Sequence, residues 1–425
     1  MPLLLALSTP LAFALTLDEA WRLAETEGTD AALVQRQLGA TTTIRGQAAS
    51  ALLPRVSLSG GYTVNQYESA IDFSKMIPEE LQGFIEDSEP IVVNQKEFWS
   101  GSLTVVQPLF SGSALPAWTA AQATARAAEA QADATLDQIR VAVARAYWGA
   151  YLGRERVRLA TDAVARAEKY LSLAQVREQI GAGRGIDTAQ AGVALARAHR
   201  ERIQSDAARV EAEEGLSRLL GVEPGVALER PPAREVGAAS AEDAVERALD
   251  APAVAASEER AKAARHVRTA TDLGWVPSVN GRFTEAYSEN SGFSGEEWNW
   301  QAAITADWML FDGGYRIAKQ REAAMNMHAA TLAVERDRDQ ARADARSLWA
   351  AHDAAKEAQI QATAERALAE QALTLAETSY EIGTLTFLDL WQTRQLRDGA
   401  EVAELAADMQ LDLAGVALIA ETGGW

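Results

Sequence analysis

Residues 136–174 read LDQIRVAVARAYWGAYLGRERVRLATDAVARAEKYLSLA. Apolar or small residues recur in this stretch at alternating steps of three and four residues, for more than five heptads. They are Leu136, Ile139, Val143, Ala146, Ala150, Gly153, Val157, Ala160, Val164, Ala167, Leu171 and Ala174. This spacing is that of a coiled-coil seam. Because most of these side chains are small, the stretch predicts a long helix that packs closely beside other helices.

The predicted helix covers residues 113–180, between a Leu-Phe-Ser-Gly motif and a glycine-rich turn. At 1.5 Å per residue it would be roughly 100 Å long, which is more than an ordinary globular domain needs. A further series of apolar residues predicts a returning helix over 187–220; it comprises Ala189, Val193, Ala196, Ile203, Ala207 and Val210. We therefore expect a long helical hairpin.

The chain is a duplication. The motif ending at Gly112 recurs as Leu-Phe-Asp-Gly at Gly313, and the turn sequence that begins at Gly181 recurs at Gly383. Matching motifs in the same order at nearly the same spacing indicate two copies of one fold. We expect a first repeat over 15–220, a linker over 221–240, and a second repeat over 241–425 with long helices at 315–382 and 386–420.

Two segments in each half change from a helical apolar period to strict alternation, which predicts strands. The four predicted strands cover residues 54–66, 98–109, 276–288 and 297–310. Strands of this length with one apolar face fit either a soluble sheet covered on one face or a membrane barrel with water inside. Four strands cannot enclose an aqueous path, so a barrel would need several chains, and three would supply twelve strands.

Charge and composition exclude several classes of protein. Lys and Arg number 40 against 60 Asp and Glu, a formal net charge of −20 that repels nucleic acid. The absence of cysteine excludes disulfides, thiolate metal sites and a lipid anchor on cysteine. The four histidines have no metal-ligand spacing and no nucleophile motif accompanies them. We expect neither an enzyme nor a bound cofactor.

The first 14 residues are apolar and end in Ala12-Phe13-Ala14, a pattern that predicts a signal peptide over 1–14 and export from the cytoplasm. The basic residues that usually open such a peptide are missing. The alternatives are a start further upstream or a buried apolar arm. No other stretch reaches the ~20 apolar residues of a membrane-spanning helix, so a membrane crossing would use the strands.

These features together resemble the TolC family of outer-membrane efflux proteins. The resemblance is carried by prolines at two strand starts, by the two Leu-Phe-x-Gly motifs, and above all by Tyr380-Glu-Ile-Gly-Thr-Leu-Thr-Phe-Leu-Asp-Leu390. It implies a mainly α protein with a transmembrane β-barrel, a homotrimer in the outer membrane of a Gram-negative bacterium with a large periplasmic part. It also implies a periplasmic adaptor protein, an inner-membrane pump and outer-membrane lipid as partners.

The family resemblance also implies a set of functional residues. For the pore constriction these are Asp187, Asp389, Tyr380, Arg184 and Gln392; for the helix turns at the periplasmic tip, Gly181, Gly183, Gly185 and Gly383; and for the junction of barrel and tunnel, Pro54, Phe110, Gly112, Pro277, Phe311 and Gly313. Three chains would supply six carboxylates from Asp187 and Asp389, a ring that attracts cations. The alternative is that both are ordinary aspartates at helix starts.

The sequence departs from the family pattern at two positions near the second turn. Leu385 stands where family members with the best-described latch have arginine, and Gln392 where they have an acidic residue. We hypothesise that Arg184 substitutes by pairing with Asp187 or Asp389. The expected function is the outer-membrane channel of a tripartite efflux system. The alternatives are the outer-membrane component of type I protein secretion, a metal-efflux channel, or a trimeric coiled-coil surface protein without a transport role.

Overall fold

The computed structural model describes residues 14–72, 90–181, 183–232, 234–292 and 294–425. The predicted signal peptide therefore lies outside the described residues apart from Ala14. The chain divides into two units. We call residues 41–126 and 259–332 the sheet unit, and residues 1–40, 127–258 and 333–425 the helical unit.

The sheet unit holds a four-stranded antiparallel sheet in the order β1-β4-β5-β6. The strands are β1 (Arg55–Val64), β4 (Glu97–Phe110), β5 (Ser278–Ser288) and β6 (Trp298–Asp307). A second small sheet pairs β2 (Ser69–Ile71) with β3 (Ile91–Asn94), which the sequence did not predict. The main strands lie where alternation placed them, but β6 ends at Asp307 and not at residue 310. Asp307 pairs with Ser278, the first residue of β5, so the ladder has no partner beyond it.

The apolar face of this sheet is exposed. Leu58 of β1 is 82% exposed, and Trp300 and Ile304 of β6 are 68% and 77% exposed. Aromatic rings contact each other across neighbouring strands, as Tyr62 and Trp99 do with ring centroids 4.9 Å apart and planes tilted by 46°. A soluble sheet buries one face, and the described part of the sheet unit does not cover this one.

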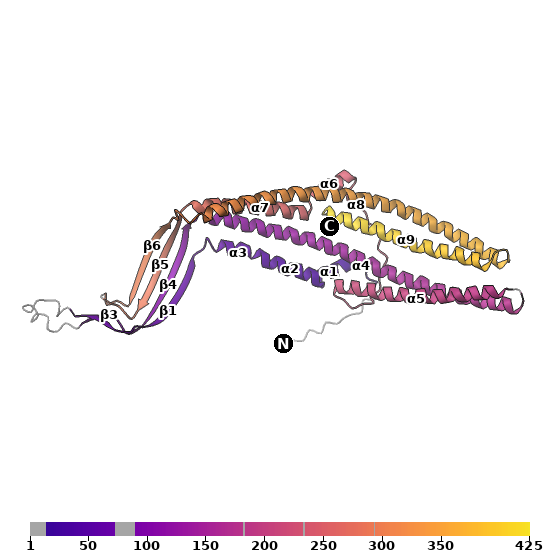
Figure 1. The fold of residues 1–425 in the computed structure, drawn as a ribbon, viewed down its shortest axis with the longest axis horizontal. Helices are drawn as coiled ribbons and strands as arrows, with labels where there is room; N and C mark the ends of the chain where they lie inside the picture. The colour runs from indigo at the N-terminus through magenta and orange to yellow at the C-terminus, as the bar shows by residue number, and fades with distance from the viewer. Residues whose placement is uncertain (1–13, 73–89, 182, 233, 293) are drawn as a thin grey trace, which may run out of the picture. The chain divides into compact units, whose positions relative to one another are not determined.

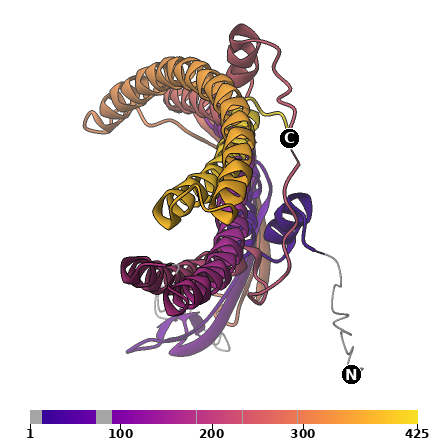
Figure 2. The same ribbon diagram turned by 90° about the vertical axis from the view of Figure 1, so that its right-hand side faces the viewer.

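Four long helices form two hairpins (Figure 1). The first consists of α4 (Ala114–Gln179) and α5 (Gly185–Leu220), and the second of α8 (Tyr315–Glu381) and α9 (Phe387–Glu421). Their ends agree with the sequence prediction to within two residues. Figure 2 looks along the helices and shows the magenta α4–α5 pair beside the orange and yellow α8–α9 pair.

Shorter helices precede the strands of each half and make the duplication visible. They are α1 (Leu17–Thr26), α2 (Thr29–Thr42) and α3 (Ile44–Ala49) in the first half, and α6 (Ala241–Leu249), α7 (Pro252–Asp272) and the 3₁₀ turn η3 (Leu273–Trp275) in the second. Both α1 and α6 begin at a hydroxyl N-cap: the Thr16 side chain accepts from the amide of Glu19, and Ser240 from that of Asp243. Such caps satisfy amides that a helix start leaves unpaired.

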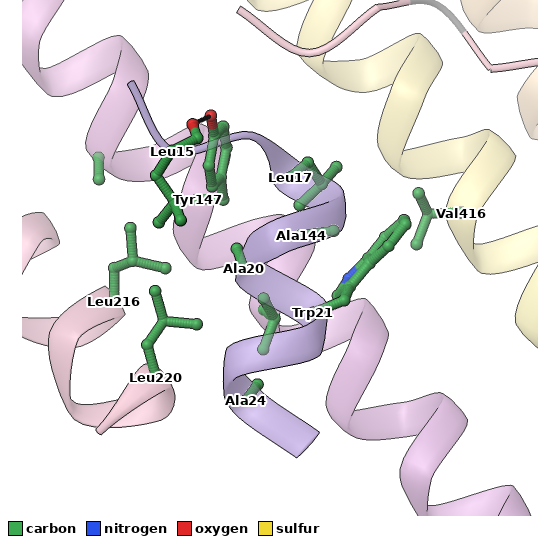
Figure 3. Close-up of a cluster of buried hydrophobic side chains, with 12 residues drawn as sticks. Leu15, Leu17, Ala20, Trp21, Ala24, Ala144, Tyr147, Leu216, Leu220 and Val416 are labelled. Atoms are coloured by element: carbon green, nitrogen blue, oxygen red, sulfur yellow. Dashed lines mark hydrogen bonds between the residues drawn. The ribbon is translucent and has the colours of Figure 1, made fainter. Parts of the chain in front are cut away.

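The predicted seam of α4 is buried in the helical unit. Val143 and Ala150 are fully buried, and they belong to a cluster to which α1, α5 and α9 also contribute (Figure 3). The indole N–H of Trp21 donates to the backbone oxygen of Arg140 at 2.8 Å. A side chain at Gly153 would come within 3.1 Å of the backbone of Arg209 on α5. The small residues of the seam therefore allow the close helix approach that the sequence predicted.

Leu15 joins the first residues of the described chain to the linker between the two repeats. It forms an isolated parallel bridge with Leu228, and the Tyr147 hydroxyl donates to its backbone oxygen (Figure 3). Within the described ranges, no helix is both long enough and apolar enough to cross a membrane.

Candidate functional site

The first helical turn, between α4 and α5, is shaped by glycine. Gly181 has a φ of +75°, in the left-handed region that glycine adopts without strain. A side chain at Gly183 would approach Arg177 and Glu178 to 3.0 Å. The Thr188 hydroxyl donates to the Glu178 carboxylate at 2.6 Å and closes the turn. Helix termination therefore explains the glycines of this segment.

The second turn, between α8 and α9, follows the same plan with one glycine. Gly383 has a φ of +82°. Thr386 caps α9, because its hydroxyl accepts from the amide of Asp389 at 3.2 Å and donates to the carboxylate of Asp389 at 2.6 Å. Asp389 is exposed. Within the described residues, its carboxylate contacts the capping residue Thr386 at the start of α9.

Arg184 makes the pairing that the sequence suggested, with Asp187 of the same turn. Its guanidinium lies 3.3 Å and 3.4 Å from the two carboxylate oxygens. The Arg184 side chain is 72% exposed and that of Asp187 26%. Exposed ion pairs of this kind contribute little to stability, so the pair is readily exchanged for another partner.

An aromatic cluster connects the two hairpins just behind the turns. Tyr380 of α8 is buried there with Phe387 and Leu390 of α9. The ring of Tyr170, from α4, meets those of Tyr380 and Phe387 edge-on at centroid distances of 6.5 Å and 5.8 Å. Leu385 packs against the same cluster. An apolar contact thus occupies the position where the family pattern has arginine.

Arg177 lies at the rim of this cluster. The Arg177 guanidinium is 4.7 Å from the centroid of the Tyr380 ring, a cation–π contact. Gln392 is exposed. Of the predicted constriction residues, the structure brings Arg184 together with Asp187, buries Tyr380, and leaves Asp389 and Gln392 at the surface of the single chain.

The α9 helix carries a line of carboxylates that was not predicted from the sequence. Each contacts a basic or indole partner on another element. The pairs are Asp398 with Arg166 of α4, Glu401 with Arg158 of α4, Glu404 with Arg366 of α8, Asp408 with Arg230 of the linker, and Asp412 with Trp148 of α4. These pairs join α9 to α4 on one side and to α8 on the other. Arg154 in turn joins α4 to Glu213 of α5. The four long helices therefore lie in the order α5, α4, α9, α8. In the sequence, these carboxylates are three or four residues apart, and this spacing could have predicted that they share one face of the helix.

The α5 helix has a second apolar seam on the face opposite its packing contacts. The residues that predicted this helix, from Ala189 through Val193 and Ile203 to Val210, are all exposed. Its buried face instead contains Ala191, Ala194, Ala198, Leu216 and Leu220 among others. The heptad series was correctly assigned to a helix, but it does not face α4.

The α8 helix has a similar unpartnered seam. Leu368 and Leu375 of α8 and Ile382, the residue that follows this helix, repeat at intervals of seven residues and are 65%, 70% and 71% exposed. Leu373 and Tyr380, on the other side of the helix, are buried. The first and last helices of the series α5, α4, α9, α8 therefore both expose an apolar coiled-coil seam.

The predicted junction residues lie in the sheet unit, where strands meet helices. Pro54 directly precedes β1, and Pro277 directly precedes β5. A side chain at Gly112 would approach the Leu273 backbone oxygen to 2.8 Å, and Gly313 has a φ of +68°. The rings of Phe110 and Phe311 are 51% and 84% exposed.

Asp312 and Arg316 fix the start of α8. The Asp312 carboxylate accepts from the amides of Gly314 and Arg316 at 3.2 Å and 3.1 Å. The Arg316 guanidinium lies 4.1 Å from the centroid of the Trp275 ring. Over the described ranges, no group of three or more His, Asp or Glu side chains could hold a metal ion.

Comparison with known proteins connects this architecture to one family. A sequence model described as outer membrane efflux protein matches residues 32–222 and 245–424. The Bordetella pertussis protein CyaE is 29% identical over 271 residues, which are 60% of this chain and 57% of that protein. The chain thus spans a little over half the length of this curated relative.

Several solved structures share the fold over nearly the whole chain. They include the outer membrane protein VceC of Vibrio cholerae (18% identity, 96% of each chain, TM-score 0.76), the Campylobacter jejuni CmeC outer membrane channel (15%, 96% of this chain and 85% of that one, 0.79), and the open state of the Neisseria gonorrhoeae MtrE outer membrane channel (18%, 96% and 88%, 0.74). At these identities the likeness is one of fold.

Proposed function

Because the chain belongs to the outer membrane efflux protein family, we propose that it is one subunit of a homotrimeric channel for passive exit from the periplasm. The observation that carries this proposal is the pair of unpartnered seams on α5 and α8. A head-to-tail contact between two different surfaces generates a closed ring when the rotation closes. Docking α5 of one copy on α8 of the next would bury both seams in a continuous helical wall.

The sheet supports the same assembly. Among the residues that the structure describes, β1 and β6 each have one neighbouring strand, and an open edge is not tolerated in lipid. Pairing β6 of one copy with β1 of the next would close twelve strands into a barrel. The exposed side chains Leu58, Trp300 and Ile304 would then face lipid.

The two helical turns are the proposed constriction. In a trimer, Asp187 and Asp389 would place six carboxylates near the ends of the hairpins, and such a ring favours cations and binds multivalent ones. Arg184 would moderate the charge through its contact with Asp187. The proposed partners at this end are a periplasmic adaptor protein and an inner-membrane pump, which would deliver the transported compounds.

Single-channel conductance in a planar lipid bilayer tests this function. We expect the purified trimer to form cation-selective channels that multivalent cations block. Asp187→Asn combined with Asp389→Asn should lose selectivity and block, because the carboxylates are gone. The matched control is Glu246→Gln, which removes an exposed carboxylate from α6 and should leave both properties unchanged.

Two results would contradict the proposal. A protein that never enters the bilayer and stays monomeric in detergent would exclude a channel. A conducting trimer whose selectivity and block are the same in the double variant would leave the channel in place and remove the acidic ring.

A further inference from the structure

A cavity of about 770 Å³ lies between α4, α5 and α9 of the helical unit. Its floor is apolar, with the buried side chains of Leu159 and Ala160 from α4 and Ala198 from α5, and the ring of Trp391 from α9 also lines it. Ligand sites for drug-sized molecules have volumes of about 300–1,000 Å³ and mostly apolar linings. The volume of the cavity and its apolar floor are therefore those of a site for a small organic molecule.

The charge of the lining is opposite to that of the chain. Five arginines line the cavity against two carboxylates, those of Glu201 and Asp398, whereas the chain has 40 basic and 60 acidic residues. A concave surface of one sign concentrates ligands of the other. The cavity therefore attracts anions to a protein that otherwise repels them.

Three of these arginines form no ion pair within the described ranges. Arg166 and Arg394 contact carboxylates on α9 and α8. Arg156, Arg197 and Arg200 have no such contact there and are exposed. Arg156 and Arg197 are the better anchors, because Arg200 stands within the exposed seam of α5 and is close to the proposed contact between copies.

The two paired arginines also retain donors. The Nε atoms of Arg166 and Arg394 are shielded from solvent and have no hydrogen-bond acceptor among the described residues. A buried donor without an acceptor carries a free-energy penalty. A ligand in the cavity cannot contact atoms that are shielded from solvent, so the unpaired side chains of Arg156 and Arg197 are the ones that can contact its charged group.

We propose that this cavity binds an amphipathic organic anion, a small molecule with an apolar body and one carboxylate or sulfonate. Its apolar body packs on Ala198 and Trp391, and the positive charges of Arg156 and Arg197 in the lining attract its charged group. Glu201 and Asp398 in the lining disfavour ligands with several negative charges. The inference depends on the fold of one chain and not on the proposed export function.

A pair of fluorescent probes that differ in charge tests the proposal. The purified trimer in lipid nanodiscs is titrated with 1-anilinonaphthalene-8-sulfonate and, separately, with its neutral analogue N-phenyl-1-naphthylamine, and empty nanodiscs provide the reference. Saturable binding of the sulfonate is expected. Arg156→Gln combined with Arg197→Gln should weaken it by roughly tenfold or more, about the loss of one charge-assisted hydrogen bond, and should leave the neutral probe unchanged.

Arg202→Gln is the matched control for charge. Arg202 is an exposed arginine of the same helix that does not line the cavity, so this variant should bind the sulfonate like the wild type. Equal sulfonate affinity in the wild type and the Arg156→Gln/Arg197→Gln variant would overturn the proposal, as would an equal loss in Arg202→Gln.

A second variant tests the location without changing charge. Gly399 lines the cavity, and nothing lies within 4 Å of the position that a Cβ atom would take there. Gly399→Leu should occupy the cavity and abolish saturable sulfonate binding, whereas Gly399→Ala should retain most of it. Unchanged binding in Gly399→Leu, or no saturable binding to the wild-type trimer, would contradict the proposed site.

Discussion

Asp412 is the least exposed carboxylate among the described residues, at 3%. It accepts from the indole N–H of Trp148 at 2.6 Å, and Arg234 lies 3.8 Å from its other oxygen. Burial raises the pKa of Asp412, although the Trp148 hydrogen bond and the Arg234 charge oppose this. A buried carboxylate held in this way is costly to remove, because the buried Trp148 N–H then loses its acceptor.

Asp412→Leu should therefore destabilise the helical unit by about 1–3 kcal/mol, since it leaves the Trp148 N–H without an acceptor, whereas Arg234 keeps its ion pair with Asp18. Asp412→Asn should have a smaller effect, because its amide oxygen can still accept from Trp148. Thermal unfolding followed by circular dichroism checks both. Equal melting temperatures for Asp412→Leu and the wild type would show that the contact contributes nothing.

Glu421 predicts a dependence of stability on pH. Burial, with a smaller contribution from Asp344, raises the pKa of Glu421 from 4.5 to about 7. Between these values the folded state holds a proton that the unfolded state has released, so the free energy of unfolding falls as pH rises. Glu421→Gln should remove this decline and raise the melting temperature at pH 8 by on the order of 2–4 °C.

Glu370→Gln provides a control of opposite sign. The hydrogen bond from Arg397 lowers the pKa of Glu370, so its contribution is present at neutral pH and is lost in acid. This variant should be slightly less stable than the wild type at pH 8, where Glu421→Gln is more stable. The same direction of change in both variants would contradict the assignment.

At the scale of the helices and their turns, two glycines have opposite effects on stability. Gly383 has a φ of +82° in the turn between α8 and α9, where any other residue is strained by about 1–2 kcal/mol. Gly399 lies inside α9 with open space around it, and there alanine favours the helix by about 1 kcal/mol. Gly383→Ala should lower the melting temperature and Gly399→Ala should raise it. Shifts in the same direction would contradict this account.

Ion pairs between the four long helices show which of their residues lie at the same height along the helix axes. Arg154 meets Glu213, Arg158 meets Glu401, and Arg366 meets Glu404. Counting along the antiparallel helices from these contacts places Ile203 of α5 level with Leu375 of α8, and Val210 level with Leu368. The two exposed seams therefore have matching heights, as two surfaces that dock between copies require.

Ile203→Glu should disrupt the trimer, because a charge would be buried in the proposed seam. Adding Leu375→Lys should restore it, since the new charges would be opposite each other. Size-exclusion chromatography with light scattering in detergent measures the assembly, and Arg202→Glu on another face of α5 is the control. A trimer that tolerates Ile203→Glu would place α5 outside the interface.

At the same scale, sequence periodicity predicted which segments form helices. It predicted less well whether the apolar face of each helix packs inside the chain. The α4 seam is buried as expected, because many small residues follow one heptad pattern without interruption. The α5 pattern has the same spacing except at Arg200, yet Val193 and Ile203 are exposed. One sequence cannot tell a seam for its own chain from a seam for another copy, because both need the same apolar spacing.

At the scale of the whole chain, the architecture could be predicted from the duplication, because two copies of one motif series predict two copies of one fold. The pairing of Leu15 with Leu228 and the partners of the α9 carboxylates were not predictable, since both depend on contacts between segments far apart in sequence. The constriction residues were named from family resemblance. Of these, Arg184 and Asp187 form a contact within the turn.

The measurement that tests the central claim most directly is cross-linking in the outer membrane. The chain has no cysteine, so Val210→Cys with Leu368→Cys introduces the only thiols. A short bifunctional maleimide should convert this variant to a covalent trimer on denaturing gels, because every copy contributes one residue to each of two contacts. Arg202→Cys with Leu368→Cys, and each single variant, should stay monomeric. A Val210→Cys/Leu368→Cys protein that also stays monomeric would contradict a ring closed by α5 and α8.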